Sequence, residues 1–361
     1  GGAETFQIKA NTIYNLGTLE KPAAVKTPTV EMNTTSVLVK QSEDETSWLT
    51  SLEGGTAGMD RNAAFDGTNV YIAKVGNEID PAIYAIPLTD PENVSMVNMT
   101  GVSGGYFPIS CIRTIPNGDD HILIGSSMGG VNIGEAINIY AWNNGIDSKP
   151  TVLCNTWTAA DKRRFGDQFT VCGNWTKGEL WFRSQKSSTT AKYNIVDGVL
   201  QNPGSPDGWG NIASDQVYLG SVYRYSMTDN KLLVVPGDKA ASLYNFSGVE
   251  TPLKMTYNMI GGITPFSYGD KKFIAYIKLS GLNSVTAELI VIEDTDENLE
   301  TALNDNLVVF KTNIHKDGNS CPAGNSGMSC NVVTVGTKTY LFGHAQNIGF
   351  AVYEITGLTE L

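Results

Sequence analysis

The stretch "NVYIAKVGNEIDPAIYAIPLTDP", residues 69–91, decides the fold class. Two short apolar segments, residues 70–73 and 83–86, are separated by a polar loop, and Pro87 ends the second because proline cannot donate a backbone hydrogen bond. The turn "FDGTN", residues 65–69, comes directly before the first segment and contains the Asp, Gly and Asn that tight turns favour. The stretch therefore predicts an antiparallel hairpin introduced by a turn.

The second segment of this hairpin is repeated along the chain. Each copy has tyrosine, or isoleucine in one case, at its second position, and the copies lie at residues 83–86, 139–142, 192–195, 243–246, 289–292 and 352–355. Their mean spacing is about 54 residues, close to the period of propeller-type repeats. Another apolar segment precedes each copy, at residues 70–73, 122–125, 180–182, 232–235, 273–276 and 340–343. The repeat predicts six equivalent units.

Two further strands complete each unit. Stretches such as "FPISCIRTI", residues 107–115, come before the hairpin, and more polar ones such as "PTVLCNTW", residues 150–157, come after it. Four antiparallel strands repeated six times predict an all-β fold, the six-bladed β-propeller. Barrels and sandwiches, the other all-β folds, would not be expected to repeat four strands about every 54 residues. The strand nearest the axis is crowded by its neighbours and therefore needs small side chains. Packing thus explains Cys111, Cys172 and Cys330, which fall at similar places in their units.

The two ends of the chain are predicted to close the ring together. The last unit ends near Gly357 after its third strand, so its open edge needs a fourth strand from elsewhere. Residues 35–42, "TSVLVKQS", have the alternation to supply it. This interpretation divides the chain into an N-terminal extension, residues 1–28, and a single propeller domain, residues 29–361. A seventh, irregular blade built from residues 1–60 is the alternative.

The net charge of the chain argues against one class of binding partner, nucleic acid. Its 361 residues include 37 acidic and 25 basic side chains, for a formal net charge of −12. Nucleic acid is not an expected partner, because phosphate backbones demand clustered Lys and Arg. No run approaches the roughly 18 apolar residues of a transmembrane helix, so the chain is not expected to span a membrane.

Metal ions and cofactors are not expected either. None of the five cysteines forms a CxxC pair, and the three histidines, His121, His315 and His344, lack the spacing of metal ligands. Cys321 and Cys330 lie nine residues apart in a Gly-rich stretch and could close a small disulfide loop. Buried free cysteines are the other interpretation.

The first repeat also carries a family resemblance. "RNAAFDGTNVYIAKV", residues 61–75, followed by "IYAIPL", residues 83–88, resembles secreted or lipid-anchored β-propeller proteins of gut Bacteroidetes, many of them in families of unknown function. The resemblance implies an extracytoplasmic location, in the periplasm or at the cell surface, with a lipid anchor as one possibility. It carries over no catalytic residue.

Candidate binding residues come from the loops. In a propeller, the loops between the second and third strands share one face with the loops between blades. Aromatic rings there can stack on apolar sugar faces, while polar groups bond to sugar hydroxyls. The candidate ligand-binding residues are Trp157, Arg163, Arg164, Trp209, Asp215, His344 and Asn347. In the other interpretation the tryptophans pack between blades and the arginines are solvated.

These observations predict a non-catalytic cell-envelope propeller that binds a glycan or a partner protein through its loop face. No catalytic residue is assigned, and the string nearest to a serine-hydrolase elbow, "GNSGM" at residues 324–328, lies among strand and loop sequence. A glycoside hydrolase or lyase with carboxylates at the channel mouth is the alternative, because acidic residues are plentiful. A structural scaffold without a small ligand is the second alternative.

Overall fold

The computed structural model shows a protein built from β-strands. It describes residues 27–42, 48–52, 60–75, 80–129, 136–157, 164–183, 190–209, 221–224, 227–228, 231–235, 242–245, 250–252, 260–280, 286–294, 307–315 and 327–361. Within these ranges the helical structure is a short 3-10 helix, η1 (Trp48–Ser51). No helix in the described part of the chain has the length and apolar character needed to cross a bilayer.

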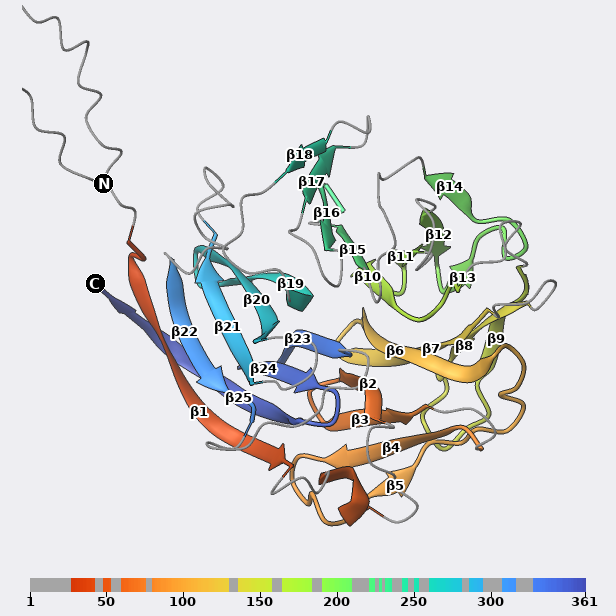
Figure 1. Cartoon of the computed structure of the whole chain (residues 1–361), viewed down its shortest axis with the longest axis horizontal. Coiled ribbons are helices and arrows are strands. Elements are labelled where there is room, and N and C mark those ends of the chain that lie inside the picture. The colour runs from red at the N-terminus through yellow and green to blue at the C-terminus, as the bar shows by residue number, and fades with distance from the viewer. Residues whose placement is uncertain are drawn as a thin grey trace, which may run out of the picture.

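The strands form six antiparallel sheets, the blades, arranged around a central axis as a six-bladed β-propeller (Figure 1). Blades 1 to 3 consist of β2 (Asp60–Phe65), β3 (Asn69–Lys74), β4 (Ala82–Pro87) and β5 (Ser95–Met96); β6 (Phe107–Asn117), β7 (Asp120–Met128), β8 (Ile137–Ala141) and β9 (Thr151–Trp157); and β10 (Phe169–Gly173), β11 (Lys177–Arg183), β12 (Thr190–Val196), β13 (Val199–Leu200) and β14 (Asp207–Trp209). Blades 4 to 6 consist of β15 (Ser221–Arg224), β16 (Lys231–Val235), β17 (Ser242–Asn245) and β18 (Glu250–Pro252); β19 (Ile260–Tyr268), β20 (Lys271–Leu279), β21 (Ala287–Glu293) and β22 (Val308–Asn313); and β23 (Met328–Val335), β24 (Lys338–Ala345), β25 (Gly349–Glu360) and β1 (Val30–Gln41).

The hairpin at residues 69–91 is the β3–β4 pair of blade 1. Tyr71 lies opposite Ala85 and Ile72 lies opposite Tyr84, while β2 and β5 pair on either side of the hairpin. The other five repeats occupy the corresponding second and third strands of their blades. The predicted unit of four antiparallel strands, repeated six times, is confirmed; in blade 3 two short strands, β13 and β14, both pair with β12 in the fourth position.

The ring closes in blade 6, where the N-terminal strand β1 pairs with β25 near the C-terminus (Figure 1). The pairing runs from Val30 opposite Glu360 to Gln41 opposite Gly349. The prediction that residues 35–42 complete the last blade is confirmed, although the strand begins earlier. Because β1 belongs to blade 6, it is not part of a seventh blade. Most of the proposed N-terminal extension, residues 1–26, lies outside the described residues.

The described residues form six hydrophobic core clusters, one at each interface between neighbouring blades. Alternate side chains of a strand point toward the two blades on either side. In blade 1, Ile72 and Tyr84 pack toward blade 6. Tyr71 and Ile83 of the same strands pack toward blade 2. A strand buried on both faces needs a continuous apolar run, which explains the runs that reveal the repeat.

Asp66 holds the turn before β3. Its Oδ1 accepts hydrogen bonds from the backbone N–H groups of Thr68 (2.7 Å) and Asn69 (2.6 Å), and its Oδ2 accepts one from the Tyr71 hydroxyl (2.5 Å). Burial, together with the Asp66 carboxylate, raises the pKa of Tyr71, so the hydroxyl remains a donor. Gly67 has a φ of 93°, which a residue with a Cβ rarely adopts. Local polar chemistry therefore specifies this turn.

Three cysteines lie on innermost strands, as the repeat predicts: Cys111 on β6, Cys172 on β10 and Cys330 on β23. All three are free thiols in the described part of the chain, and Cys321, the other cysteine of the possible disulfide loop, lies outside the described residues. Burial raises the pKa of Cys172 to about 11 and that of Cys330 to about 12. Both therefore remain protonated at neutral pH.

Candidate functional site

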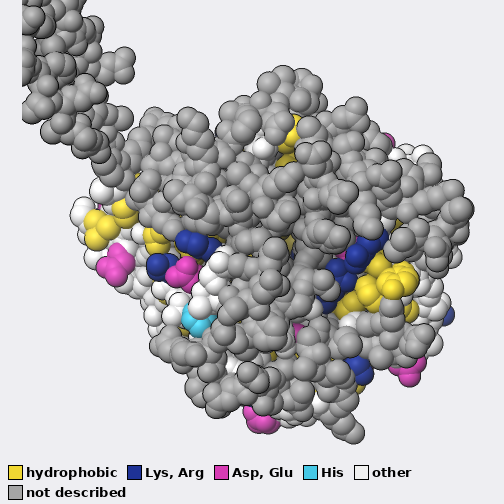
Figure 2. Space-filling model, viewed as in Figure 1, with side chains coloured by type: hydrophobic (Ala, Val, Ile, Leu, Met, Phe, Trp, Pro, Cys, Tyr) yellow, Lys and Arg dark blue, Asp and Glu magenta, His cyan; other side chains and the backbone are white. Residues whose placement is uncertain are grey.

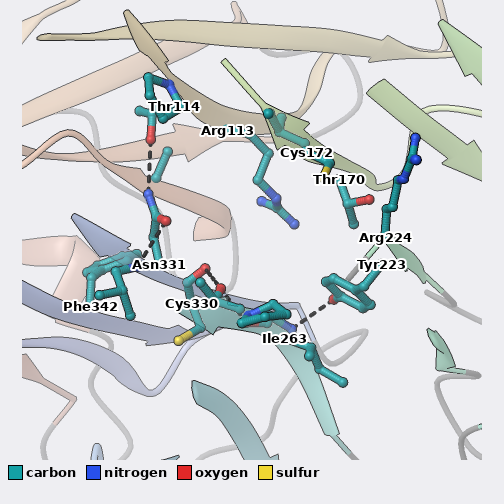
Figure 3. Close-up of a pocket in the computed structure, with 18 of the residues that line it drawn as sticks. Arg113, Thr114, Thr170, Cys172, Tyr223, Arg224, Ile263, Cys330, Asn331 and Phe342 are labelled. Atoms are coloured by element: carbon teal, nitrogen blue, oxygen red, sulfur yellow. Dashed lines mark hydrogen bonds between the residues drawn. The ribbon is translucent and has the colours of Figure 1, made fainter. Parts of the chain in front are cut away.

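The innermost strands of all six blades enclose a cavity of about 380 Å³ on the axis of the ring (Figure 3). Its volume lies within the range of small-molecule sites. Small residues such as Ala63 and Ala64 of β2 and Gly262 of β19 form part of the wall and leave the space open. Polar side chains on the wall include Arg113, Thr114, Thr170, Tyr223, Arg224, Thr264 and Asn331.

Arg113 on β6 directs its guanidinium group into this cavity (Figure 3). Its Nη1 donates to the Asn62 side-chain oxygen, to the Ile112 carbonyl at 2.7 Å and to Ser329 Oγ at 3.4 Å. Its Nη2 donates to Gln168 Oε1 at 3.3 Å. These acceptors are all neutral, and no described carboxylate forms an ion pair with Arg113. The cation is therefore held in place without being neutralised.

The partners of Arg113 locate it along the axis. Asn62 is the third residue of β2, Ser329 is the second residue of β23, and Gln168 directly precedes β10. Innermost strands are entered from the connections between blades. The Arg113 guanidinium group therefore lies at the end of the cavity nearest to the inter-blade loops.

Further arginines surround this end of the cavity. Asp167, next to Gln168, forms ion pairs of 2.8 Å with both Arg61 and Arg164. Burial lowers the pKa of Arg61, whose guanidinium also lies 5.7 Å from the centre of the Phe107 ring. Figure 2 shows one face of the molecule, on which Lys and Arg side chains lie next to hydrophobic side chains. With Arg113, the described residues of this cluster are three arginines and one aspartate, in a chain of net charge −12.

Hydroxyl and amide groups on the wall have fixed orientations. Thr114 Oγ1 donates to the Phe65 carbonyl at 2.7 Å, and Asn331 Nδ2 donates to Thr114 Oγ1 at 3.1 Å. The Tyr223 hydroxyl accepts a hydrogen bond from the Gly262 backbone N–H at 2.9 Å. Each of these bonds joins two blades, so the wall is organised before a ligand arrives.

The second arginine of the wall, Arg224, forms a close ion pair with Glu179. Glu179 also accepts a hydrogen bond from Trp181 Nε1 at 2.9 Å. Among the described residues that line the cavity there is no Asp, Glu or His. Nor does the described part of the chain contain three or more His, Cys, Asp or Glu side chains grouped as metal ligands. The wall can therefore offer hydrogen bonds and one uncompensated positive charge.

Trp157 lies between blades 2 and 3 rather than on the loop face. It is 5% exposed, and its ring centre lies 5.0 Å from Phe165, 5.6 Å from Phe182 and 5.4 Å from Tyr193. This placement gives Trp157 a packing role. A contact between its ring and a ligand stays a prediction.

The other loop candidates have different placements. Arg164 is half-buried in the ion pair with Asp167, beside the end of the cavity nearest to the inter-blade loops, which we call the loop-side mouth. Trp209 ends strand β14, opposite Thr190 of β12, although the sequence predicted an inter-blade loop there. Arg163 and Asp215 lie outside the described residues.

His344 and Asn347 meet at Asp60, where blade 6 joins blade 1. The Nε2 atom of the fully buried His344 lies 3.2 Å from Asp60 Oδ2. The Asn347 backbone N–H donates to Asp60 Oδ1 at 3.0 Å. This arrangement fastens the two ends of the ring, and a role of either residue in ligand binding stays a prediction.

Sequence reasoning missed Arg113 and its partners. The signal available was a single charge inside the apolar stretch "FPISCIRTI", residues 107–115. Charged residues are rarely buried without a partner, so an arginine in an inner strand marks a special environment. Asn62, Gln168 and Ser329 gave no comparable signal.

The fold has relatives among solved structures. A DUF4623 family protein from Bacteroides eggerthii superposes with a TM-score of 0.66 at 17% identity, covering 84% of this chain and 72% of that one. This likeness shows the propeller fold alone and agrees, at that level, with the resemblance carried by residues 61–75.

Two further structures are more distant. An auxiliary nutrient binding protein from Bacteroides thetaiotaomicron has a TM-score of 0.49 at 11% identity, covering 90% of this chain and 77% of that one. An exo-β-1,3-galactanase from Phanerochaete chrysosporium has a TM-score of 0.41 at 8% identity, covering 69% and 62%. Neither likeness carries an argument about function. No protein-family model matches the sequence, and no curated protein matches it significantly.

Proposed function

We propose that this protein is a non-catalytic, extracytoplasmic propeller that binds a glycan at the loop-side mouth of its axial cavity. The observation that carries the proposal is the cavity wall, to which all six innermost strands contribute. Its oriented hydroxyl and amide groups suit sugar hydroxyls, and the Phe342 and Ile263 side chains add apolar surface. A pocket that is mostly apolar and has a small number of converging polar groups is typical of a small-ligand site.

The composition of the wall supports binding over hydrolysis. Glycoside hydrolysis uses two carboxyl groups that flank the scissile bond. The described residues lining the cavity include no carboxylate, and the nearby Asp167 and Glu179 are engaged in ion pairs with arginines. The same loop face could instead hold a partner protein of the envelope, and the experiment separates these outcomes.

The test is affinity electrophoresis of the purified protein through gels containing pectin, xylan, arabinogalactan, mucin or chondroitin sulfate. We expect retardation by at least one polysaccharide and no release of reducing ends after prolonged incubation. Release of reducing ends would overturn the non-catalytic assignment. Unchanged mobility in every gel would overturn glycan binding and leave the protein-partner alternative.

A matched surface variant controls for charge. Lys338 lies in the β23–β24 hairpin, at the end of the blade away from the inter-blade connections, where it pairs with Glu354 at 2.9 Å. K338A should retain the retardation of the wild-type protein. Asn331 forms part of the cavity wall, and N331A should reduce retardation.

A further inference from the structure

We infer that Arg113 binds a carboxylate group of the ligand, so that the axial cavity selects acidic sugars, the hexuronates, over neutral ones. The inference rests on the proposed function, because it names the class of glycan that the same cavity takes. It depends on three features: the free edge of the guanidinium, the charge around it and the size of the cavity.

One edge of the Arg113 guanidinium is available to a ligand. Nη1 is occupied by three acceptors, whereas the single described contact of Nη2 is to Gln168 at 3.3 Å. No described residue accepts a hydrogen bond from Nε. The N–H groups of Nε and Nη2 point in parallel, and this fork matches the two oxygens of a carboxylate.

The charge around Arg113 favours an anion. Its described partners are neutral, and the adjacent Arg61 and Arg164 share the single carboxylate of Asp167. Arg224 in the same wall provides the contrast, since Glu179 already neutralises it. An ion pair formed in a partly desolvated site is stronger than one formed in water. The cavity therefore contains one arginine with its anion and one without.

The size of the cavity favours a sugar acid over a bare anion. A volume of about 380 Å³ is much larger than an acetate or sulfate ion requires. The remaining wall offers Thr114, Thr264 and Asn331 to hydroxyl groups. A carboxylate on Arg113 would place the sugar ring attached to it among these groups.

The test is isothermal titration calorimetry with matched sugars. D-galacturonate and D-glucuronate are compared with D-galactose and D-glucose, and sodium acetate and sulfate test for binding of the anion alone. The wild-type protein should bind at least one uronate about tenfold or more tightly than its neutral parent, the discrimination expected of a charge-assisted bidentate contact. R113Q should lose this preference.

R113K and K338R form the matched control. R113K keeps the charge but loses the fork and should weaken the preference, whereas K338R, which also keeps its charge and lies outside the cavity lining, should leave it unchanged. If R113Q fails to fold by circular dichroism, the comparison of R113K with K338R decides the question. Equal preference for uronates in the wild type and R113K would overturn the inference, as would an equal loss in R113K and K338R.

The outcomes separate the inference from the proposed function. Sugar binding without any preference for uronates would overturn the carboxylate site and leave glycan binding intact. Acetate or sulfate binding that depends on Arg113, with no sugar bound more tightly, would support the anion site and overturn glycan binding. Binding of uronates above both anions and neutral sugars supports both.

Discussion

Replacing Trp157 with alanine should destabilise the protein without removing glycan binding. The side chain is 5% exposed and contacts three aromatic rings at the interface of blades 2 and 3. Two of these rings, Phe182 and Tyr193, belong to blade 3, so the substitution opens a cavity between blades. Its effect should therefore appear in the free energy of unfolding and not in ligand affinity.

The magnitude follows from burial. Substituting alanine for a buried tryptophan costs about 3–5 kcal/mol. Unfolding entropy of about 2.1 cal/mol/K per residue, over the 361 residues of the chain, converts each kcal/mol into about 1.3 °C of melting temperature. W157A should consequently melt about 4–7 °C below the wild type in differential scanning calorimetry, while its retardation in polysaccharide gels is retained.

W157F is the matched control because it keeps an aromatic ring in the cluster. It should lose less than half as much melting temperature as W157A. The reasoning would be refuted if W157A melted with the wild type and lost glycan retardation. That result would show the indole ring contacting the ligand, as the sequence first suggested.

Two further predictions concern ring closure and the inner-strand thiols. Deleting residues 27–41 removes β1 and exposes the edge of β25, so the truncated protein should aggregate in size-exclusion chromatography. A synthetic peptide of residues 27–42 should restore a monodisperse species, and a truncated protein that is monomeric with unchanged melting would contradict this role. Burial raises the pKa of Cys172 to about 11 and that of Cys330 to about 12, above the ordinary value of 9.0. The thiols of the unfolded chain ionise at a lower pH than the buried thiols of the folded protein. The free energy of unfolding therefore keeps its full value below pH 9 and falls as the pH rises toward 11–12. For Cys330 the loss is about 2 kcal/mol by pH 10.5, so the urea midpoint of C330A should fall less between pH 8 and 10.5 than that of the wild type; equal falls would refute the shift.

The sequence by itself determined the blade and favoured six of them, while the choice between six and seven blades needed the structure, which places β1 in blade 6. Turn residues such as Asp66 and Gly67 act on their immediate neighbours, so each hairpin is specified within one short stretch. Burial on both faces forces apolar runs, and these recur along the chain with a mean spacing of about 54 residues. Counting strands also predicted closure, because the last unit lacked a fourth strand and residues 35–42 had the alternation to supply it.

Only the tertiary structure decided the site. The described side-chain partners of Arg113 lie 51, 55 and 216 residues away in sequence, on three different blades, and no local pattern connects them. Trp157 likewise packs on a neighbouring blade, which its own surroundings in the sequence do not show. Strand pairing within a blade acts between segments adjacent in the chain. The axis, in contrast, gathers residues from every blade, and they meet only once the ring has closed.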